Sequence, residues 1–383
     1  MDNELRIIIS GGGTGGHIFP AVSIANAIKE IHPEAKILFV GAEGRMEMQR
    51  VPAAGYEIEG LPVSGFDRKN LLKNISVLIK LWKSECKAKR IIRNFKPQVA
   101  VGVGGYASGP TLNMAGKLGI PTLLQEQNGY AGVTNKLLAK RAKKICVAYE
   151  QMERFFPAEK IIMTGNPVRQ ALVQTTLTRE EGIKHFDLDP KKKTILIIGG
   201  SLGARTINES ILAGLNLVQA SNEASAIDNQ IQLIWQTGKY YYKEMDERVK
   251  QNATQKFPLY MNDFISSMEH AYAAADLVIS RAGAGSISEF CLLGKAVILV
   301  PSPNVAEDHQ TKNAMALVKK GAAICITDKE APIKLIPEAL KLIHDAERIK
   351  KLQENILTLA KPNAAATIAN EVILLANEYR STH

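Results

Sequence analysis

Short runs of β-branched and other apolar residues recur along the chain, and each run is followed by a glycine-rich turn and then by a segment with helical periodicity. Strands that alternate with helices in this way predict βαβ units around a parallel sheet that is buried on both faces. The clearest strand, turn and helix units are predicted at Leu5–Ser10, Gly11–Gly16 and Ala21–Ile28; Val99–Val103, Gly104–Gly105 and Thr111–Lys117; Thr194–Ile198, Gly199–Gly203 and Ile207–Leu215; and Asp276–Ser280, Gly283–Gly285 and Ile287–Leu293.

The two halves of the chain repeat one order of elements: a glycine turn, a helix, Leu-Gly, a strand, a polar loop and another helix. Gly119 in the first half matches Gly294 in the second, an offset of 175 residues. A repeat of this length indicates two similar domains. We place them at residues 1–165 and 166–363, followed by a last helix within 364–383. The helices after the polar loops are predicted at Thr134–Lys144 and Gln310–Lys320.

Composition agrees with a two-domain globular protein. The chain has 383 residues, of which 46% are hydrophobic and 22% charged, and it carries a formal charge of +10, which favours an anionic partner. Its four cysteines form no C-x-x-C pair, so neither a disulfide framework nor a structural zinc site is expected. The start of the chain lacks the pattern of a signal peptide, and no apolar run is long enough to span a membrane. We therefore expect a soluble, cytoplasmic protein.

The turn Ser10–His17 follows a predicted strand and opens a helix, as a phosphate-binding turn does. Its glycines satisfy G-x-G-x-x-G, but the acidic residue that a dinucleotide site needs is missing at the expected distance, since Glu43 comes late. A P-loop is excluded because His17 stands where the lysine should be. A histidine at the first turn of a helix, among residues that let a ligand approach, is a candidate proton acceptor, and the alternative is a capping or packing role.

Two further turns in the second half suit a phosphorylated ligand. In Gly199–Arg205, the Ser201 hydroxyl and the start of the helix could bind a phosphate. In Arg281–Glu289, the Glu289 carboxylate could accept hydrogen bonds from a ribose, or could form a capping box with Ser286. Several such turns at the carboxyl ends of strands in two like domains predict a ligand in a cleft that the domains face, and hence a nucleotide-using enzyme.

Residues 68–96 hold ten Lys and Arg but a single acid, and an apolar stripe recurs at helical spacing. The stripe consists of Leu71, Ile75, Leu78 and Trp82. A basic amphipathic helix with a tryptophan is typical of an anionic membrane surface, and the alternative is a helix that packs this stripe on the sheet. Nucleic acid is not expected as a partner, because no aromatic residues are interleaved with the charges.

Motifs from both halves, taken together, resemble the MurG family of peptidoglycan N-acetylglucosaminyltransferases, in order and over nearly the whole chain. The motifs are Gly12–Ala21, Gly104–Pro110, Glu126–Asn128, Thr134–Lys136, Gly165–Arg169, Gly199–Asn208, Ser280–Ala284 and Asp308–Ala314. The resemblance implies a GT-B glycosyltransferase with two Rossmann-like domains, whose last helix returns to the first domain. It implies an inverting transfer of GlcNAc from UDP-GlcNAc to the C4 hydroxyl of MurNAc in lipid I (undecaprenyl-pyrophosphoryl-MurNAc-pentapeptide), at the cytoplasmic face of the inner membrane.

The resemblance also implies roles for residues at matching positions. His17 is the expected base, with Glu126 as its rival. Thr14, Gly15, Gly16 and Asn128 are expected to face the sugar and the acceptor, and Arg169 to lie near the nucleotide. The expected donor site in the second domain comprises Ser201, Ile265, Ala284, Gly285, Ser286, Ile287, Ser288, Glu289 and Gln310. Tyr106, Asn135 and the apolar stripe of residues 71–82 are expected on the acceptor and membrane side.

No metal or other cofactor is expected, because the nearest acidic pair, Asp187 and Asp189, lies in a charged stretch that we predict to be a solvated loop. Leu202 stands where many members of the family carry glutamine, so a side-chain contact is not expected there. Two alternatives remain: a UDP-GlcNAc 2-epimerase of the same fold, and an NAD-dependent oxidoreductase that rests on Gly11–Gly16 alone.

Overall fold

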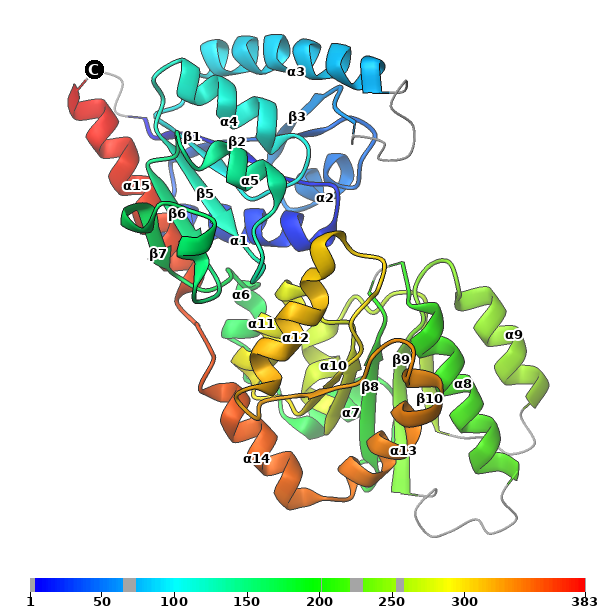
Figure 1. Ribbon diagram of the computed structural model, residues 1–383. Helices are drawn as coiled ribbons and strands as arrows, with labels where there is room; N and C mark the ends of the chain where they lie inside the picture. The colour runs from blue at the N-terminus through cyan, green and yellow to red at the C-terminus, as the bar shows by residue number, and fades with distance from the viewer. Residues whose placement is uncertain (1–3, 65–73, 201, 221–229, 253–257, 383) are drawn as a thin grey trace. The chain divides into compact units, whose positions relative to one another are not determined.

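The computed structural model describes residues 4–64, 74–200, 202–220, 230–252 and 258–382. The chain forms two compact units (Figure 1): Met1–Gln170 together with Lys361–His383, and Ala171–Ala360. The sequence predicts the boundary after residue 165, and the resemblance implies that the last helix returns to the first domain.

The first unit is built on a parallel sheet in the strand order β3-β2-β1-β4-β5-β6-β7. The strands are β1 (Arg6–Ser10), β2 (Lys36–Ala42), β3 (Glu57–Leu61), β4 (Val99–Gly102), β5 (Thr122–Glu126), β6 (Lys144–Val147) and β7 (Ile161–Met163). The helices are α1 (Gly15–Ile31), α2 (Glu47–Ala53), α3 (Asn74–Phe95), α4 (Ser108–Lys117), α5 (Val133–Leu138) and α15 (Ala364–Thr382), with single 3₁₀ turns at Met152–Arg154 and Ala158–Lys160.

The second unit has the parallel strand order β10-β9-β8-β11-β12-β13, which is the order of the first six strands of the first sheet. The strands are β8 (Lys193–Ile198), β9 (Ile231–Gln236), β10 (Leu259–Asn262), β11 (Leu277–Ser280), β12 (Val297–Leu299) and β13 (Ile324–Cys325). The helices are α7 (Arg179–His185), α8 (Arg205–Ala220), α9 (Tyr242–Asn252), α10 (Met268–Ala274), α11 (Ala284–Leu293), α12 (His309–Val318), α13 (Ala331–Ile343) and α14 (Ala346–Leu357), with a short α6 (Gln170–Val173) before them and a 3₁₀ turn at Ala306–Asp308.

The predicted fold class, two doubly wound parallel-sheet units, is confirmed by these two sheets. Both have the strand order of a Rossmann fold, and the first adds one strand at its edge. The predicted repeat aligns equivalent elements, because Gly119 precedes β5 and Gly294 precedes β12, the fifth strand of each unit. Both glycines end a helix with a positive φ, of 81° and 60°, which favours glycine over other residues.

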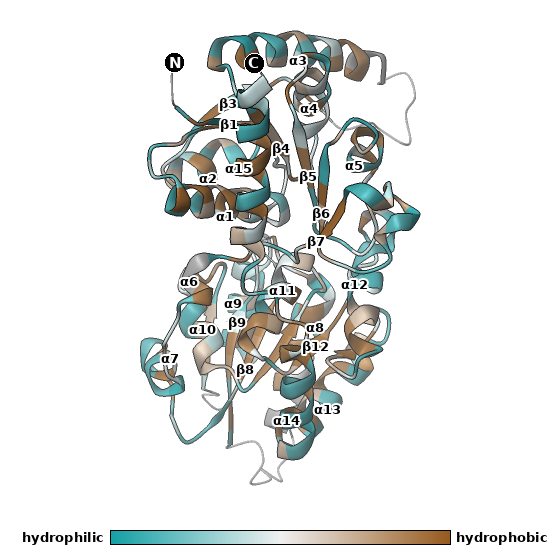
Figure 2. Cartoon of the chain, turned by 90° about the vertical axis from the view of Figure 1, so that its left-hand side faces the viewer, coloured by the Kyte–Doolittle hydropathy of each residue, from teal (hydrophilic) through white to brown (hydrophobic). Residues whose placement is uncertain are grey.

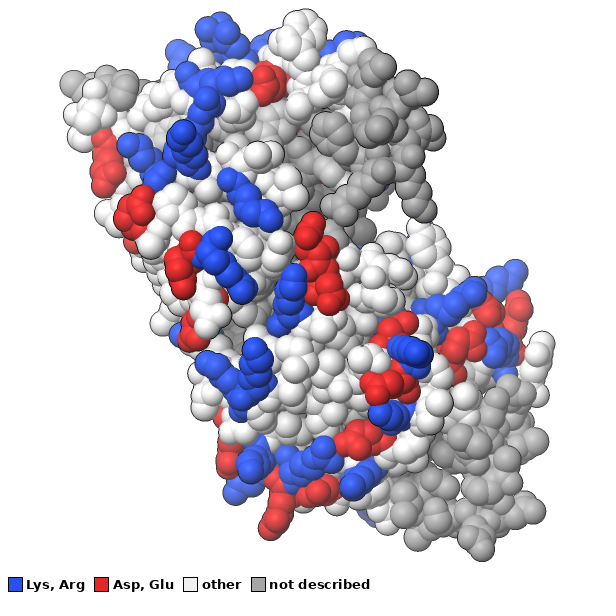
Figure 3. Space-filling model, viewed as in Figure 1, with Lys and Arg blue, Asp and Glu red and all other residues white. Residues whose placement is uncertain are grey.

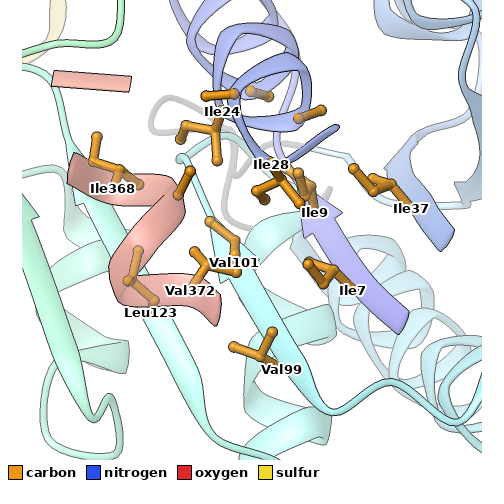
Figure 4. Close-up of a cluster of buried hydrophobic side chains, with 14 of the residues drawn as sticks. Ile7, Ile9, Ile24, Ile28, Ile37, Val99, Val101, Leu123, Ile368 and Val372 are labelled. Carbon is orange, nitrogen blue, oxygen red and sulfur yellow. The ribbon is translucent and has the colours of Figure 1, made fainter. Parts of the chain in front are cut away.

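Each sheet is apolar on both faces, as buried parallel strands require. In β1, Ile7 and Ile9 point to one face and Ile8 to the other, and all three are fully buried. Figure 4 shows Ile9 beside Ile28 of α1, and Val101 of β4 beside Val372 of α15, all within one buried cluster. The last helix is therefore part of the first unit's core. The strands β8 and β9 of the second unit are mainly hydrophobic, whereas α7 is largely hydrophilic apart from its buried Gly182 and Ile183 (Figure 2).

One predicted element is wrong. The sequence predicts a helix at Thr134–Lys144, but α5 ends at Leu138 and Lys144 begins β6. The apolar run Ile145–Val147 is buried between β5 and β7, and sheet pairing there determines the structure. In the sequence, the basic residues before this run continue the helical pattern of α5, but in the structure they lie after the end of the helix.

The buried amino group of Lys295 affects the stability of the second unit in a way that depends on pH. The Lys295 Nζ donates to Ala275 O at 3.1 Å, and burial lowers the pKa of Lys295 to about 8, against an opposing attraction to Asp276. Because the folded-state pKa lies below the unfolded value of 10.5, the charged lysine destabilises the fold fully below about pH 8. This cost disappears as the pH rises through the interval from about 8 to about 10.5.

We therefore expect Lys295→Met to stabilise the protein at about pH 7 by about 2 kcal/mol, since loss of the buried charge outweighs loss of one hydrogen bond. Urea unfolding at about pH 7 and about pH 10 measures this, and the gain should be much smaller at the higher pH. Lys319→Met, at an exposed lysine of the same unit, is the control. A gain of equal size at both pH values would contradict the expected role of the charge.

Candidate active site

Three turns of the first unit meet at the carboxyl edge of its sheet. They follow β1, β4 and β5, which are neighbouring strands. The Gln127 Nε2 donates to Val103 O at 2.7 Å and so joins the second and third turns. Gly105, with a φ of 90°, lies so close to Gly12 that a Cβ would overlap Gly12 O, which joins the first and second turns. The three turns thus form one continuous surface.

His17 lies in the first turn of α1 and is half-buried. Its Nδ1 is 3.0 Å from Gly12 O. A carbonyl oxygen can only accept, so we assign the proton to Nδ1 and the lone pair to Nε2. The ring lies against Gly104, where a Cβ would stand 2.9 Å from His17 Nε2. The candidate base therefore has a fixed position and a defined tautomer.

Glu126, the rival base, is almost completely buried at the end of β5. Its carboxylate accepts hydrogen bonds from Asn128 N at 3.1 Å, from Gly132 N at 3.0 Å and from Asn135 Nδ2 at 2.9 Å. These donors belong to the loop that follows β5. The carboxylate holds this loop in shape, which is a structural task that competes with proton abstraction.

The other predicted residues of the glycine turn lie at the surface of the first unit. Thr14 caps α1 with an extended backbone, and its carbonyl accepts from His17 N at 3.1 Å. Thr14 and Gly16 are exposed, and Gly15 is partly so. Tyr106, in the turn after β4, is 53% exposed. These residues are accessible to a ligand.

The remaining predicted residues of this unit differ in accessibility. Asn128 contacts Glu126 through both its backbone and its side-chain nitrogen. Asn135 is buried, and its amide nitrogen binds Glu126, so it supports the loop from inside. The Arg169 guanidinium lies 5.7 Å from the ring centre of Phe19, an exposed residue of α1.

A buried acid beneath the glycine turn was not among the predicted site residues. Glu47, the first residue of α2, is fully buried and accepts from Gly13 N at 2.9 Å. The Gly13 amide is therefore occupied by a carboxylate, which argues against the phosphate that a dinucleotide would place at this turn. Glu47 lies 34 positions from Gly13, so no local motif indicates the contact.

In the second unit, the buried Gln236 at the end of β9 connects two predicted ligand segments. Its Nε2 donates to Gly200 O at 3.2 Å, and its Oε1 accepts from Ile265 N at 3.0 Å. The Ile265 amide is thus engaged within the unit, and a contact from this residue to a base would use its carbonyl. Ser201, in the same turn as Gly200, lies outside the described residues.

The turn before α11 does not form the capping box that the sequence suggested. The helix begins at Ala284 with Gly283 as its N-cap, so Ser286 is already the third helical residue. The Glu289 Oε2 instead accepts from the hydroxyl of the buried Tyr272 at 2.7 Å. This contact orients the carboxylate, and Tyr272 is a partner that sequence reasoning missed.

The other donor-site residues of α11 and α12 contribute in different ways. Ile287 is buried in the core, whereas Ser288 is partly buried and its hydroxyl donates to Ala284 O of the same helix at 3.0 Å. Gly285 is open: a Cβ there, as at Gly283, would meet no described atom within 4 Å. The Gln310 Oε1 accepts from Ser302 N at 2.9 Å and thereby holds the loop after β12.

The start of α11 is suited to an anionic ligand. The first amides of a helix lack acceptors within the helix, and the helix dipole favours negative charge there. Gly200, which precedes α8, has a φ of 88° and is also open, since a Cβ there would meet no described atom within 4 Å. Glycine at these positions leaves room for a ligand to approach the backbone.

Two residues of the predicted apolar stripe lie on the outer side of α3. Leu78 is 55% exposed and Trp82 66% exposed, whereas Val77, Ala88 and Ile91 are buried. The alternative that Leu78 and Trp82 pack on the sheet is therefore wrong. Figure 3 shows Lys and Arg side chains gathered over α3. Leu71 lies outside the described residues, and so does the side chain of Ile75, a residue of α3.

In the ranges that the structure covers, no helix has both the length and the apolar character needed to cross a membrane. In the same ranges, no three His, Cys, Asp or Glu side chains lie close enough together to hold a metal ion. Asp187 and Asp189, the nearest acidic pair in the sequence, are exposed in the loop between α7 and β8.

Comparison with known proteins gives matches in both halves of the chain. Residues 7–147 match the glycosyltransferase family 28 N-terminal domain, and residues 194–371 match the glycosyltransferase family 28 C-terminal domain. A relative from Bacteroides fragilis is 67% identical over 98% of this chain and 97% of its own length. One from Porphyromonas gingivalis is 55% identical over 97% of each chain. Both are named UDP-N-acetylglucosamine--N-acetylmuramyl-(pentapeptide) pyrophosphoryl-undecaprenol N-acetylglucosamine transferase.

Among solved structures, MurG from Acinetobacter baumannii matches with a TM-score of 0.74 at 26% identity and covers 96% of this chain and 99% of its own. A UDP-GlcNAc 2-epimerase from Neisseria meningitidis bound to UDP-GlcNAc matches with a TM-score of 0.66 at 15% identity, over 97% and 99% of the two chains, which is a likeness of fold alone. The full-length relatives and both domain matches agree: the chain belongs to glycosyltransferase family 28 and has the GT-B fold.

Proposed function

We propose that the chain is an inverting glycosyltransferase that moves GlcNAc from UDP-GlcNAc to the C4 hydroxyl of MurNAc in lipid I, forming lipid II for peptidoglycan. The observation that carries the proposal is the identity of 67%, over almost the whole of both chains, to a relative named for a transfer between these substrates. We assign the roles of the site residues and the membrane surface from geometry and from the matching motifs.

The second unit is proposed to bind the donor. The open turn at Gly200 and the first amides of α8 and α11 would bind the diphosphate, since both helix starts favour negative charge. Glu289, oriented by Tyr272, would accept from the ribose hydroxyls. The carbonyl of Ile265 would contact the uracil, and Gln310 would hold the loop beside the sugar. By its matching motif, Arg169 is assigned a place near the nucleotide.

The first unit is proposed to bind the acceptor, with His17 as the general base. Because Nδ1 donates to Gly12 O, the lone pair of Nε2 can take the proton of the MurNAc C4 hydroxyl. The C4 oxygen then attacks the anomeric carbon from the side opposite UDP, whose bond to that carbon breaks, so the configuration inverts. The exposed Thr14, Gly16 and Tyr106 would contact the sugars. Glu126 is assigned to loop support.

The exposed apolar side of α3 is proposed to dock on an anionic membrane, where the lipid-linked acceptor resides. Leu78 and Trp82 would enter the headgroup region, and the exposed Lys80 and Lys83 would contact anionic lipid. Lys87 of the same helix is engaged with Glu43, at 2.9 Å, and is not counted among these contacts. We propose that this docking occurs at the cytoplasmic face of the cell membrane, and we propose no nucleic-acid partner.

The proposed reaction can be separated from the two alternatives by one assay. With UDP-GlcNAc and a short-chain lipid I analogue, we expect UDP to be released only when the acceptor is present, and a β-linked disaccharide product. An epimerase would convert UDP-GlcNAc without any acceptor. If UDP is not released in the presence of the acceptor and UDP-GlcNAc is not converted either, both the transferase and the epimerase are rejected.

For the base, we expect His17→Ala to lower kcat by about a hundredfold or more, because the proton acceptor is lost. The affinity for UDP, measured by calorimetry, should change by less than about twofold, since His17 lies outside the proposed donor unit. His32→Ala, at an exposed histidine at the other end of α1, is the control. A kcat that stays at the level of the unmodified enzyme would transfer the role to Glu126.

For the membrane surface, we expect Trp82→Glu to weaken binding to anionic liposomes by about tenfold, because a charge replaces the interfacial aromatic ring. Activity on a soluble acceptor should not change. Leu374→Glu, at an exposed apolar residue of α15, is the matched control and should bind liposomes normally. Equal liposome binding by both variants would reject the α3 surface.

A further inference from the structure

The carboxylate of Glu47 is enclosed beneath the first glycine turn. Its side chain is fully buried. Its Oε2 accepts from Gly13 N at 2.9 Å and its Oε1 accepts from Ala42 N at 3.0 Å. Both partners are donors, so each oxygen must accept, as the oxygens of an ionised carboxylate do. As the first residue of α2, Glu47 also has its negative charge where the helix dipole favours it.

One peptide group connects this carboxylate to the candidate base. The N–H of Gly13 and the C=O of Gly12 belong to the same planar unit. Its N–H donates to Glu47, and its C=O accepts from His17 Nδ1 at 3.0 Å. Hydrogen bonds in such a chain polarise one another, so a carboxylate on the N–H makes the carbonyl a stronger acceptor. Glu47 therefore acts on His17 without touching it.

The packing around Glu47 is built to hold this side chain. A Cβ at Gly12 would overlap the Glu47 carboxylate, and a Cβ at Gly41 would lie 2.6 Å from Glu47 Cγ. Glycine at both positions leaves the space that the side chain fills. The carboxylate, the peptide and the imidazole consequently have one arrangement in the fold.

We propose that Glu47 is a positioning residue for the transfer reaction: through the Gly12–Gly13 peptide it keeps the proton of His17 on Nδ1 and raises the basicity of Nε2. The hydrogen bond at one nitrogen of a histidine decides which nitrogen carries the proton. A weaker acceptor at Gly12 allows the proton to move to Nε2, and an imidazole in that tautomer cannot take a proton from the acceptor hydroxyl through Nε2. The catalytic part of this inference rests on the proposed function, whereas the tautomer part does not.

A purely structural role is the competing explanation, because Glu47 also closes the turn and begins α2. The two roles differ in whether the charge of residue 47 or the length of its side chain matters more. Glu47→Gln preserves the shape, removes the charge and turns an NH2 group towards one of the two backbone donors, whereas Glu47→Asp preserves the charge and both acceptor oxygens but shortens the side chain. If Glu47 acts by polarising the peptide, Glu47→Gln should lower kcat more than Glu47→Asp does. If its role is structural, Glu47→Asp should lower kcat at least as much as Glu47→Gln.

The test uses the full chain with ¹⁵N-labelled histidine, and the His17 resonances are identified by their loss in His17→Gln. In the unmodified protein above the titration range of His17, we expect the Nδ1–H tautomer. In Glu47→Gln we expect a substantial share of Nε2–H. Glu43→Gln is the matched control, since Glu43 is an exposed acid in the same segment, pairs with Lys87 and should leave the tautomer unchanged.

In steady-state assays with UDP-GlcNAc and the lipid I analogue, we expect Glu47→Gln to lower kcat by about tenfold to a hundredfold, with KM for UDP-GlcNAc within about twofold. Glu47→Asp should retain more of kcat than Glu47→Gln. An unmodified protein in the Nε2–H tautomer, or an unchanged tautomer in a folded Glu47→Gln, overturns the proposal. If Glu47→Gln does not fold, the tautomers of the unmodified protein and of Glu47→Asp decide.

A changed tautomer with an unchanged kcat would have a different meaning. It would support the connection between Glu47 and His17 and would remove His17 as the base, so it would count against the proposed mechanism only. Loss of activity in Glu47→Asp equal to or greater than that in Glu47→Gln would favour the structural role and overturn the positioning role.

Discussion

Both units depend on one constraint: the carboxyl ends of neighbouring parallel strands lie at the same edge of a sheet, so the turns that follow them must pack against one another. Only glycine fits where these turns touch. In the first unit, a Cβ at Gly105 would overlap Gly12 O, and in the second, a Cβ at Gly238 would overlap Gly203 N. The contacts join the turns after β1 and β4 and the turns after β8 and β9. The glycines that resemble ligand-binding signals in the sequence are thus partly requirements of packing.

Within this shared frame, the two units differ in what their first turn can bind. In the first unit, the buried carboxylate of Glu47 occupies the Gly13 amide and adds negative charge beneath the turn. In the second, the corresponding turn contains the open Gly200 and leads into α8. A diphosphate is favoured at the second turn and disfavoured at the first. The difference in electrostatics supports a donor on the second unit and explains why G-x-G-x-x-G in the first unit is a poor indicator of a dinucleotide.

The sequence predicted the doubly wound fold class, the internal repeat and the presence of a helix after each glycine turn, because apolar β-branched runs and glycine turns are local signals, but it placed the starts of α1, α4 and α11 several residues too late. It failed where tertiary pairing decides, as at Lys144, which begins β6 instead of ending a helix. It also failed for the side chains that support the site. Tyr272 orients Glu289, and Gln236 connects Gly200 to Ile265, across separations of 17, 36 and 29 residues. Such contacts arise only when the sheet brings distant turns together.

Two buried carboxylates in the first unit accept backbone hydrogen bonds, and their partners distinguish their tasks. The Glu126 carboxylate accepts hydrogen bonds from donors of the loop that follows it. These hydrogen bonds explain why the carboxylate can be buried, and no catalytic role is needed to explain it. One oxygen of Glu47 accepts from the Ala42 amide at the end of β2. The other accepts from the Gly13 amide, and the carbonyl of the same peptide group accepts from His17. A base needs an available lone pair and a fixed direction. The Gly12 carbonyl fixes the direction of the His17 ring and leaves the lone pair on Nε2, whereas Glu126 would have to break its loop to act, so the geometry favours the imidazole.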